Sequence, residues 1–227
     1  MAQATGQPLS LVLRDWLGAS ARVAIARADR GHFAALPAEE RAAVIRAVPA
    51  RQAEFATARV LARRLLAQLG APRASLPRQA DRAPAWPADI EASITHTEGH
   101  CLVVARKRSG LGVGIDWERA SRLSRAHWDG VLTQREQEQL SACAQPESVA
   151  MQCFSVKESL FKAMQRCGNA GLDFLAVEVS PSASGSAECA LHLLDDFSRR
   201  LPAGAVVRAW CSALPDGGVI SAAEVRA

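Results

Sequence analysis

Residues 92–107 read ASITHTEGHCLVVARK, and this stretch decides which fold we expect. Two segments rich in Ile, Thr and Val, residue types that favour extended structure, flank the turn-like sequence TEGH at 97–100. The pattern predicts an antiparallel hairpin of two short strands.

Helical patterns precede this hairpin. The segment 51–70, RQAEFATARVLARRLLAQLG, repeats apolar residues at helical spacing and ends at Gly70, a residue type that commonly terminates helices. The segment 37–48, PAEERAAVIRAV, begins with Pro and two acidic residues, as helix N-termini prefer. Residues 71–92 are rich in Pro and Arg, and we expect them to form a loop.

Strands and helices also follow the hairpin. Residues 109–118, SGLGVGIDWE, predict a further strand after a Gly-rich turn, and helical patterns cover about 125–145 and 148–166. The expected fold is therefore α+β, with antiparallel sheets and packed helices. We divide the chain into two similar halves, 1–110 and 111–227. The remaining predicted strands are 175–180, 187–194, 205–214 and 219–225.

The 227-residue chain has the composition of a globular protein, with 49% hydrophobic and 22% charged residues. Its N-terminal sequence lacks the basic and apolar regions of a signal peptide, and no apolar run approaches the roughly 20 residues that span a bilayer. The six cysteines form no Cys-x-x-Cys motif and fit neither a zinc site nor a disulfide scaffold. We expect a cytoplasmic protein with reduced thiols and no membrane contact.

Positive charge is concentrated in one part of the chain. Residues 51–110 hold ten basic and five acidic residues, although the net charge of the whole chain is only +4. Either a solvated, arginine-rich helix face or a binding site for an anion such as phosphate explains this excess. Arg51 and Arg59, eight residues apart in the predicted helix, either flank one anion or are ordinary exposed helix arginines.

Asp116 and Glu118 lie two residues apart on the predicted strand, so their carboxylates point to the same face. Two like charges at this spacing repel each other unless an Arg or a metal ion lies between them. Oxygen ligands of this kind suit Mg²⁺, whereas the alternative is a solvated strand edge.

The stretch FSVKESLFKA, residues 154–163, contains two of the three lysines of the chain, Lys157 and Lys162. Ser155 and Glu158 have the spacing of a capping box, which predicts a helix start. Glu158 also lies four residues before Lys162, as in a stabilising surface ion pair, although a Lys ammonium is equally suited to contact a phosphate. We expect a buried face of Val156, Leu160, Ala163 and Met164, opposite Ser155, Glu158 and Lys162.

His96 ends the first strand of the predicted hairpin, next to the turn. A histidine at this position is either a hydrogen-bonded structural residue or a side chain that reaches a ligand. The residue types alone leave both interpretations open.

Taken together and in order, four of these segments resemble the 4′-phosphopantetheinyl transferases that activate surfactin and enterobactin synthetases, with the closer likeness to the enterobactin-type branch. The resemblance implies a monomer of two α+β halves related by pseudo-twofold symmetry, with the active site at their interface and coenzyme A between them. The segments are RQAEFATAR (51–59), RAPAWPADIEASITHT (82–97), GVGIDWE (112–118) and FSVKESLFKA (154–163).

The same resemblance implies the reaction. A serine of an acyl or peptidyl carrier protein attacks the β-phosphate of coenzyme A, phosphopantetheine is transferred with the help of Mg²⁺, and adenosine 3′,5′-bisphosphate leaves. Such carriers serve fatty-acid, polyketide or siderophore biosynthesis. A Mg²⁺-dependent hydrolase of nucleotide pyrophosphates is one alternative. A basic nucleic-acid-binding module is the other, and the aromatic content of 5% and the lack of Tyr argue against it.

Site residues follow from the resemblance, position by position. Asp116, Glu118 and Glu158 correspond to the acidic residues that hold Mg²⁺, and Trp117 between the first two offers only its backbone carbonyl to the ion. Glu158, directly or through a water, is the candidate base for the serine proton. Lys162 corresponds to the lysine near the reacting phosphate, and His96 to a coenzyme A-contacting residue in the catalytic site. The other implied coenzyme A contacts are Arg51, Arg59, Arg78, Arg82, Thr95 and Leu172.

Three positions depart from the family pattern. Trp117 stands where an aliphatic residue is usual, and Ala58 and Ala92 stand where relatives often have Gly. We expect each to add bulk near the nucleotide groove without removing a charged group. The role of Lys157, which matches the family's lysine before the glutamate, stays open.

Three arginines follow the predicted metal strand, namely Arg119, Arg122 and Arg125. Because carrier proteins are usually acidic, we expect this segment to contact the carrier. Trp128, Val131 and Leu132 lie nearby, and the alternative is an ordinary amphipathic helix.

Overall fold

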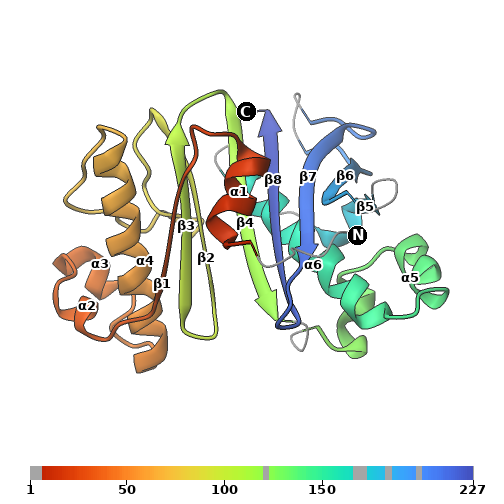
Figure 1. The fold of residues 1–227 in the computed structure, drawn as a ribbon, viewed down its shortest axis with the longest axis horizontal. Coiled ribbons are helices and arrows are strands. Elements are labelled where there is room, and N and C mark those ends of the chain that lie inside the picture. Colours follow the sequence, from red (N-terminus) through yellow and green to blue (C-terminus); the bar gives the residue numbers. More distant parts are fainter. Residues whose placement is uncertain (1–6, 120–122, 166–172, 182–185, 198–200, 227) are drawn as a thin grey trace. The chain divides into compact units, whose positions relative to one another are not determined.

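The computed structural model describes residues 7–119, 123–165, 173–181, 186–197 and 201–226. The chain forms two compact units, the N-terminal unit Leu9–Ser109 and the C-terminal unit, which contains the chain from Gly110 onward. Each unit combines helices with an antiparallel sheet (Figure 1), so the predicted α+β class is confirmed. No helix among the described residues is both long enough and apolar enough to cross a membrane.

The sheet of the N-terminal unit has the strand order β1–β3–β2, with β3 antiparallel to both neighbours. The predicted hairpin is confirmed: Thr97 pairs with His100, and Glu98 and Gly99 form the turn with φ of 44° and 73°. Two-residue turns with positive φ at both positions match the twist of the strands they join. The elements of this unit are α1 (Leu9–Leu17), β1 (Arg22–Arg27), α2 (Gly31–Ala34), α3 (Ala38–Ala42), α4 (Pro49–Gln68), β2 (Ile90–Thr97) and β3 (His100–Lys107).

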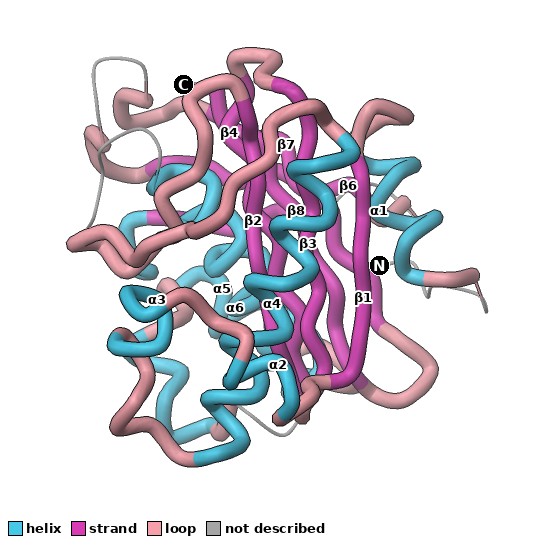
Figure 2. The backbone as a smooth tube through the Cα atoms, turned by 90° about the vertical axis from the view of Figure 1, so that its left-hand side faces the viewer, coloured by secondary structure: helices cyan, strands magenta, loops and turns pink. Residues whose placement is uncertain are grey.

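Helix α4 lies against one face of this sheet (Figure 2), where Leu65 and Leu66 share a hydrophobic cluster with Val103. The helix ends as the sequence predicts. Gly70 adopts φ of 69°, and the Ala71 N–H donates to the Leu66 carbonyl at 2.9 Å, which is the hydrogen bond of a Schellman motif. The local sequence therefore determines both the apolar face and the end of α4.

The helix predicted over 37–48 is shorter than expected. Helix α3 covers only Ala38–Ala42, and Pro49 starts α4 as a separate helix. Val48, the residue before this proline, is extended with ψ of 150°. Proline disfavours a helical conformation in the preceding residue, so one continuous helix cannot form here.

The C-terminal unit has a five-stranded antiparallel sheet with the order β4–β8–β7–β6–β5. Helix α6 packs against β4, β8 and β7, and a hydrophobic cluster fills the space between helix and sheet. The elements of this unit are β4 (Leu111–Arg119), η2 (Arg125–Gly130), α5 (Gln134–Ser141), α6 (Pro146–Met164), η4 (Phe174–Ala176), β5 (Val177–Pro181), β6 (Glu188–Leu193), β7 (Val206–Ala213) and β8 (Gly218–Arg226).

Two helix predictions in this unit need correction. The pattern over 125–145 is divided into the 3₁₀-helix η2 and the helix α5, which begins after Thr133. The capping box predicted for Ser155 and Glu158 is wrong, because α6 begins at Pro146, and proline is well suited to the first helical position. A real capping box joins Thr133 and Glu136, each of which receives a backbone N–H from the other.

Two glycines let α6 approach strand β4 closely. A Cβ atom on Gly114 would lie 1.8 Å from the carbonyl oxygen of Ser159, and one on Gly112 would lie 2.5 Å from that of Ala163. Both distances are far below van der Waals contact, so only glycine fits at these positions. The sequence GVGID therefore places the backbone of α6 directly against the strand that carries Asp116.

Substitution of Gly114 by Ala is expected to destabilise the C-terminal unit by about 3 kcal/mol, because the helix backbone must move to admit the methyl group. Urea unfolding measures the effect. Gly130→Ala is the matched control, because a Cβ there meets nothing within 4 Å. If both variants unfolded at the same urea concentration, α6 would not lie as close to β4 as the structure shows.

Candidate active site

Asp116 is a residue of strand β4. Its side chain faces helix α6, and the residue is only 2% exposed. Both of its carboxylate oxygens are engaged: Ser155 Oγ donates to Oδ2 at 2.9 Å, and Lys162 Nζ donates to Oδ1 at 2.6 Å. The Lys162 ammonium also reaches the carbonyl of Ile115 at 3.1 Å. Glu118, two residues further along β4, is 7% exposed, so the solvated strand edge considered as an alternative does not describe this pair.

Glu158 lies on the face of α6 that carries Ser155 and Lys162, three residues after the one and four residues before the other. Side chains at these spacings are neighbours on a helix. Both flanking residues touch Asp116, so Glu158 belongs to the stripe of α6 that carries these two contacts. The C-terminal unit thus brings Ser155 and Lys162 onto Asp116, and Glu158 lies between them along the helix.

Ser155 differs from its predicted place on an exposed face. It is fully buried, and its hydroxyl forms hydrogen bonds with Asp116 and with Ser221 of strand β8. Glu158 and Lys162 are partly exposed. The predicted buried face is confirmed, since all four of its members are at most 1% exposed: Val156, Leu160, Ala163 and Met164.

The oxygen atoms of Asp116 and of its neighbours on β4 suit a hard cation that retains part of its hydration shell. No three His, Cys, Asp or Glu side chains are grouped closely enough to hold a metal ion by themselves anywhere in the described part of the chain. Mg²⁺ does not need such a cage, because it is commonly bound by one or two carboxylates, waters and a substrate phosphate. The Trp117 carbonyl points to the same strand edge as the Ile115 carbonyl, since carbonyl directions alternate along a strand.

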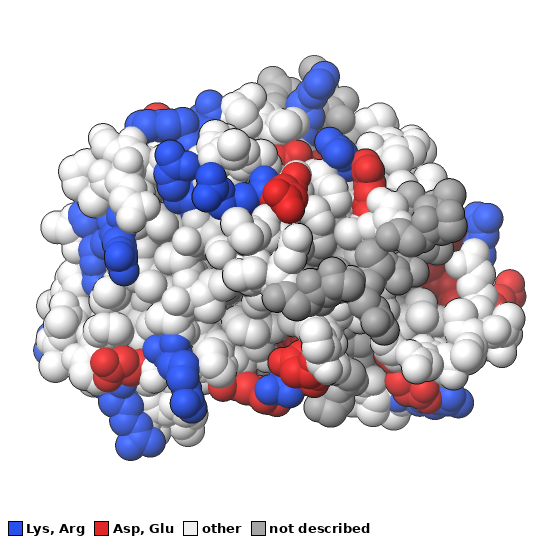
Figure 3. Space-filling view, viewed as in Figure 1, with Lys and Arg blue, Asp and Glu red and all other residues white. Residues whose placement is uncertain are grey.

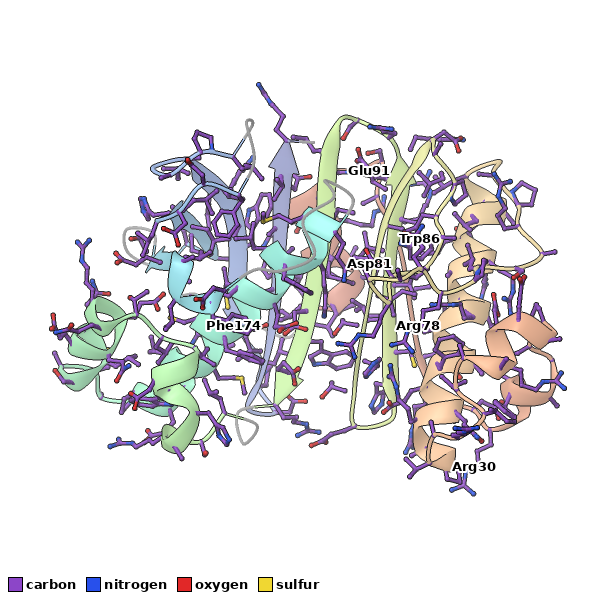
Figure 4. The ribbon with its side chains drawn as sticks, turned by 180° about the vertical axis from the view of Figure 1, so that it is seen from behind. Arg30, Arg78, Asp81, Trp86, Glu91 and Phe174 are labelled. Carbon is purple, nitrogen blue, oxygen red and sulfur yellow. The ribbon has the colours of Figure 1, made fainter. Side chains whose placement is uncertain are left out.

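Lys157 points in another direction from Lys162 and is fully buried. Its ammonium donates to Glu136 Oε2 at 2.6 Å and to the carbonyls of Val131 and Phe174 at 2.8 and 3.0 Å. All three donors of the ammonium are therefore used. Figure 4 shows the position of Phe174 beside α6. Lys157 is a structural residue that ties α6 to the segments before α5 and β5.

In the N-terminal unit, the structure brings Arg51 of α4 and His96 of β2 into direct contact through a hydrogen bond between Arg51 Nη1 and His96 Nε2. A guanidinium only donates, so Nε2 accepts and Nδ1 carries the proton of the neutral ring. Glu54 Oε2 lies 3.6 Å from His96 Nδ1 and 3.5 Å from Arg51 Nη1. The His96 ring is thus held between a cation and a carboxylate.

Arg59 is not the exposed helix arginine that was considered as an alternative, because it is only 4% exposed. Its Nε donates to the Leu76 carbonyl at 3.1 Å, and its guanidinium lies 4.4 Å above the centre of the Phe55 ring. Burial lowers the pKa of Arg59 to about 10; nearby Glu40 opposes this shift, and neighbouring arginines add to it. Figure 3 shows further Lys and Arg side chains over the visible face of this unit.

Arg78 and Arg82 lie on the loop between α4 and β2, and both are exposed. Arg78 pairs with Pro84 across this loop, and Arg82 has φ of 71°, which turns the chain back between them. Asp81, labelled in Figure 4 with Arg78, closes the same turn by accepting the Ala83 N–H at 2.9 Å.

Thr95 and His96 are neighbours on β2, so their side chains point to opposite faces of the sheet. Thr95 is 4% exposed, whereas the His96 side chain is 33% exposed. Leu172, the last of the predicted coenzyme A contacts, lies outside the described residues.

Comparisons with known proteins agree with these two units. The profile of the 4′-phosphopantetheinyl transferase N-terminal domain matches residues 39–106, and the profile of the 4′-phosphopantetheinyl transferase superfamily matches residues 112–211. The 4′-phosphopantetheinyl transferase Svp of Streptomyces mobaraensis is 36% identical over 206 residues, which is 82% of each chain. The chain belongs to the 4′-phosphopantetheinyl transferase superfamily.

Two further relatives of this transferase match over shorter stretches. The 4′-phosphopantetheinyl transferase Npt of Nocardia iowensis is 33% identical over 128 residues, 56% of this chain and 57% of that one. Enterobactin synthase component D of Escherichia coli is 36% identical over 95 residues, 41% of this chain and 46% of that one. The protein is an enzyme that transfers 4′-phosphopantetheine to carrier proteins, so neither the hydrolase nor the nucleic-acid-binding alternative describes it.

Two of the three departures of this transferase from its family pattern lie in the core. Ala58 and Ala92 are 2% and 6% exposed and belong to the hydrophobic cluster between α4 and the sheet. Their methyl groups therefore fill the interior of the N-terminal unit rather than the nucleotide groove. Trp117 is partly exposed, and nothing in the structure explains why an indole stands there.

Sequence reasoning missed two residues of the transferase. Glu54 was not singled out, although its spacing of three from Arg51 in the predicted helix was a signal of contact. Ser221 carries no motif at all. It reaches Ser155 only because β8 pairs with β4, where Ser221 lies opposite Asp116.

Proposed function

We propose that this transferase takes 4′-phosphopantetheine from coenzyme A, places it on a carrier-protein serine with the help of Mg²⁺, and releases adenosine 3′,5′-bisphosphate. One observation carries the proposal: the Asp116 carboxylate, buried and held on one oxygen by Ser155, faces the Lys162 ammonium on the other. Phosphoryl transfer depends on positioned groups that balance charge. A carboxylate that binds a cation, next to an ammonium that binds a phosphate, meets that need.

The side chains on α6 have separate roles in this scheme. The serine oxygen forms a bond to the β-phosphorus while the bond from phosphorus to the leaving bisphosphate breaks. Glu158 takes the serine proton, directly or through a water, because its side chain is partly exposed and a substrate can reach it from solvent. Lys162 stays close to Asp116 and balances the negative charge that grows on the transferred phosphate.

Asp116, Glu118, Glu158 and the Trp117 carbonyl are the proposed ligands of Mg²⁺. Because the three carboxylates do not form a cage in the described residues, the ion would use one or two of them together with waters and a substrate phosphate. The ion supplies charge neutralisation on the pyrophosphate oxygens when it is bound. The chemistry of the ligand set supports this assignment, since it consists of oxygen atoms only, as Mg²⁺ prefers.

The N-terminal unit supplies the proposed nucleotide cradle. Burial and, to a smaller extent, the neighbouring arginines lower the pKa of Arg59, and a phosphate placed beside it would favour the charged guanidinium. Arg51, held against His96 and Glu54, offers guanidinium donors to a phosphate. We assign the same role to Arg59, Arg78 and Arg82. Thr95, whose side chain points to the other face of the sheet from His96, stays a proposed contact of coenzyme A, and Leu172 a proposed contact of the substrate groove.

The carrier is proposed to bind next to the metal strand, at Arg119 and Arg125; Arg122 lies outside the described residues. Arg125 is exposed, stacks over Trp128 at 5.2 Å and pairs with Glu147 at 2.7 Å. We also propose that a single chain is active and that it works in the cytoplasm. The five cysteines in the described residues are free thiols, which is typical of a reducing compartment.

A labelling experiment tests the proposed function. The full chain is incubated with an apo-carrier protein and a fluorescent coenzyme A analogue, and the carrier is expected to gain the label on one serine. Chelation of Mg²⁺ with EDTA is expected to stop labelling, and excess Mg²⁺ to restore it. Labelling that persists in EDTA would contradict the proposed role of the metal, and consumption of coenzyme A without any carrier would indicate hydrolysis instead.

A further inference from the structure

Three buried serine hydroxyls lead from the interior of the C-terminal unit to Asp116. Ser159 and Ser155 lie on α6, Ser221 lies on β8, and all three are fully buried. Ser159 Oγ lies 2.7 Å from Ser221 Oγ, which lies 2.8 Å from Ser155 Oγ, and Ser155 Oγ lies 2.9 Å from Asp116 Oδ2. The three contacts form a continuous chain of hydrogen bonds from Ser159 to Asp116.

The number of hydroxyl protons available determines which serine donates in each of these hydrogen bonds. A carboxylate only accepts, so the single hydroxyl proton of Ser155 goes to Asp116. Ser221 must then be the donor to Ser155, either at Oγ or at the backbone carbonyl, which lies 2.8 Å away. The proton of Ser221 is used there, so Ser159 donates to Ser221. The hydroxyls of Ser159 and Ser155 therefore point along this chain of hydrogen bonds toward Asp116, and the Ser221 hydroxyl between them points to Ser155.

We propose that Ser159, Ser221 and Ser155 act together as positioning residues for Asp116, an inference that rests on the proposed function. Hydroxyl groups in a chain polarise one another, so the last donor binds the carboxylate more firmly than an isolated serine would. The chain holds Oδ2 on the buried side and leaves Oδ1 toward Lys162 and the cation. None of the three serines touches substrate.

A packing role is the competing explanation, because the close approach of α6 to β4 and β8 favours small side chains. Alanine distinguishes the two explanations. It occupies nearly the volume of serine but removes the hydroxyl, so Ser→Ala preserves the packing and breaks the chain. Partners of metal-binding residues typically affect metal affinity about 10–100-fold.

The test measures Mn²⁺ binding to the full chain by electron paramagnetic resonance, without coenzyme A or carrier. Ser221→Ala is expected to raise the Kd for Mn²⁺ about 10-fold. Ser155→Ala is expected to raise it more and Ser159→Ala less, in the order of their distance from the carboxylate. Ser212→Ala is the matched control, because Ser212 is a serine of 2% exposure on the neighbouring strand β7.

Two outcomes would overturn the inference: an equal Kd for Ser221→Ala and Ser212→Ala, or the absence of the order among the three chain variants. If Ser221→Ala does not fold, the comparison of Ser159→Ala with Ser212→Ala decides in the same way. Failure of the proposed function has a different signature, because the wild-type chain would then show neither Mn²⁺ binding nor Mg²⁺-dependent labelling of the carrier.

Discussion

Replacement of Asp116 by Asn is expected to lower kcat/KM for carrier labelling about 10²–10³-fold, the size of effect seen when one preorganised charge-stabilising group is removed. Asn keeps the shape of the side chain, and its carbonyl oxygen can still accept from Ser155. The substitution removes the negative charge that faces Lys162 at 2.6 Å and that we assign to the cation. We therefore expect the substitution to lower the labelling rate rather than to disturb the packing.

Single-turnover labelling with saturating coenzyme A analogue measures this effect. Circular dichroism and the Tm establish that the variant remains folded. Asp129→Asn is the matched control, because Asp129 is an exposed residue of the same unit whose Oδ1 accepts from Gln137 at 3.3 Å. A folded Asp116→Asn enzyme that labelled its carrier at the rate of Asp129→Asn would show that the site is misassigned.

Replacement of Lys157 by Met is expected to lower the free energy of unfolding by about 3–5 kcal/mol, the usual effect of removing one member of a buried ion pair. Met has a similar length and fits the same space. The substitution leaves the Glu136 carboxylate, 2% exposed, without its ammonium partner, and takes a donor from the carbonyls of Val131 and Phe174. This effect falls on stability because Lys157 points away from Asp116.

Urea unfolding of Lys157→Met, Glu136→Gln and the double variant measures the pair as a thermodynamic cycle. The double variant is expected to lose less stability than the two single variants together, because no charge is then left buried alone. A Lys157→Met protein within about 1 kcal/mol of wild type would contradict the structural role. Lys162→Met is the comparison within the same helix: its side chain is 21% exposed, so we expect a smaller loss of stability and a larger loss of labelling.

The local sequence predicted those parts of the fold that depend on neighbours along the chain. The hairpin around Glu98 and Gly99 and the end of α4 at Gly70 follow from turn chemistry within a few residues. The start of α6 could not be predicted in the same way. Ser155 and Glu158 have the spacing of a helix cap, but the hydroxyl of Ser155 is used by Asp116, 39 residues away in sequence.

The sequence by itself determined the family and the set of acidic and basic residues that carry the proposed chemistry. It could not distinguish Lys157 from Lys162. Five residues separate them, so they point to different sides of α6, and only the packed sheet decides which side is buried. Tertiary structure made Lys157 part of the core through Glu136 and placed Lys162 on Asp116, because each lysine finds its partner on a distant segment rather than along its own helix.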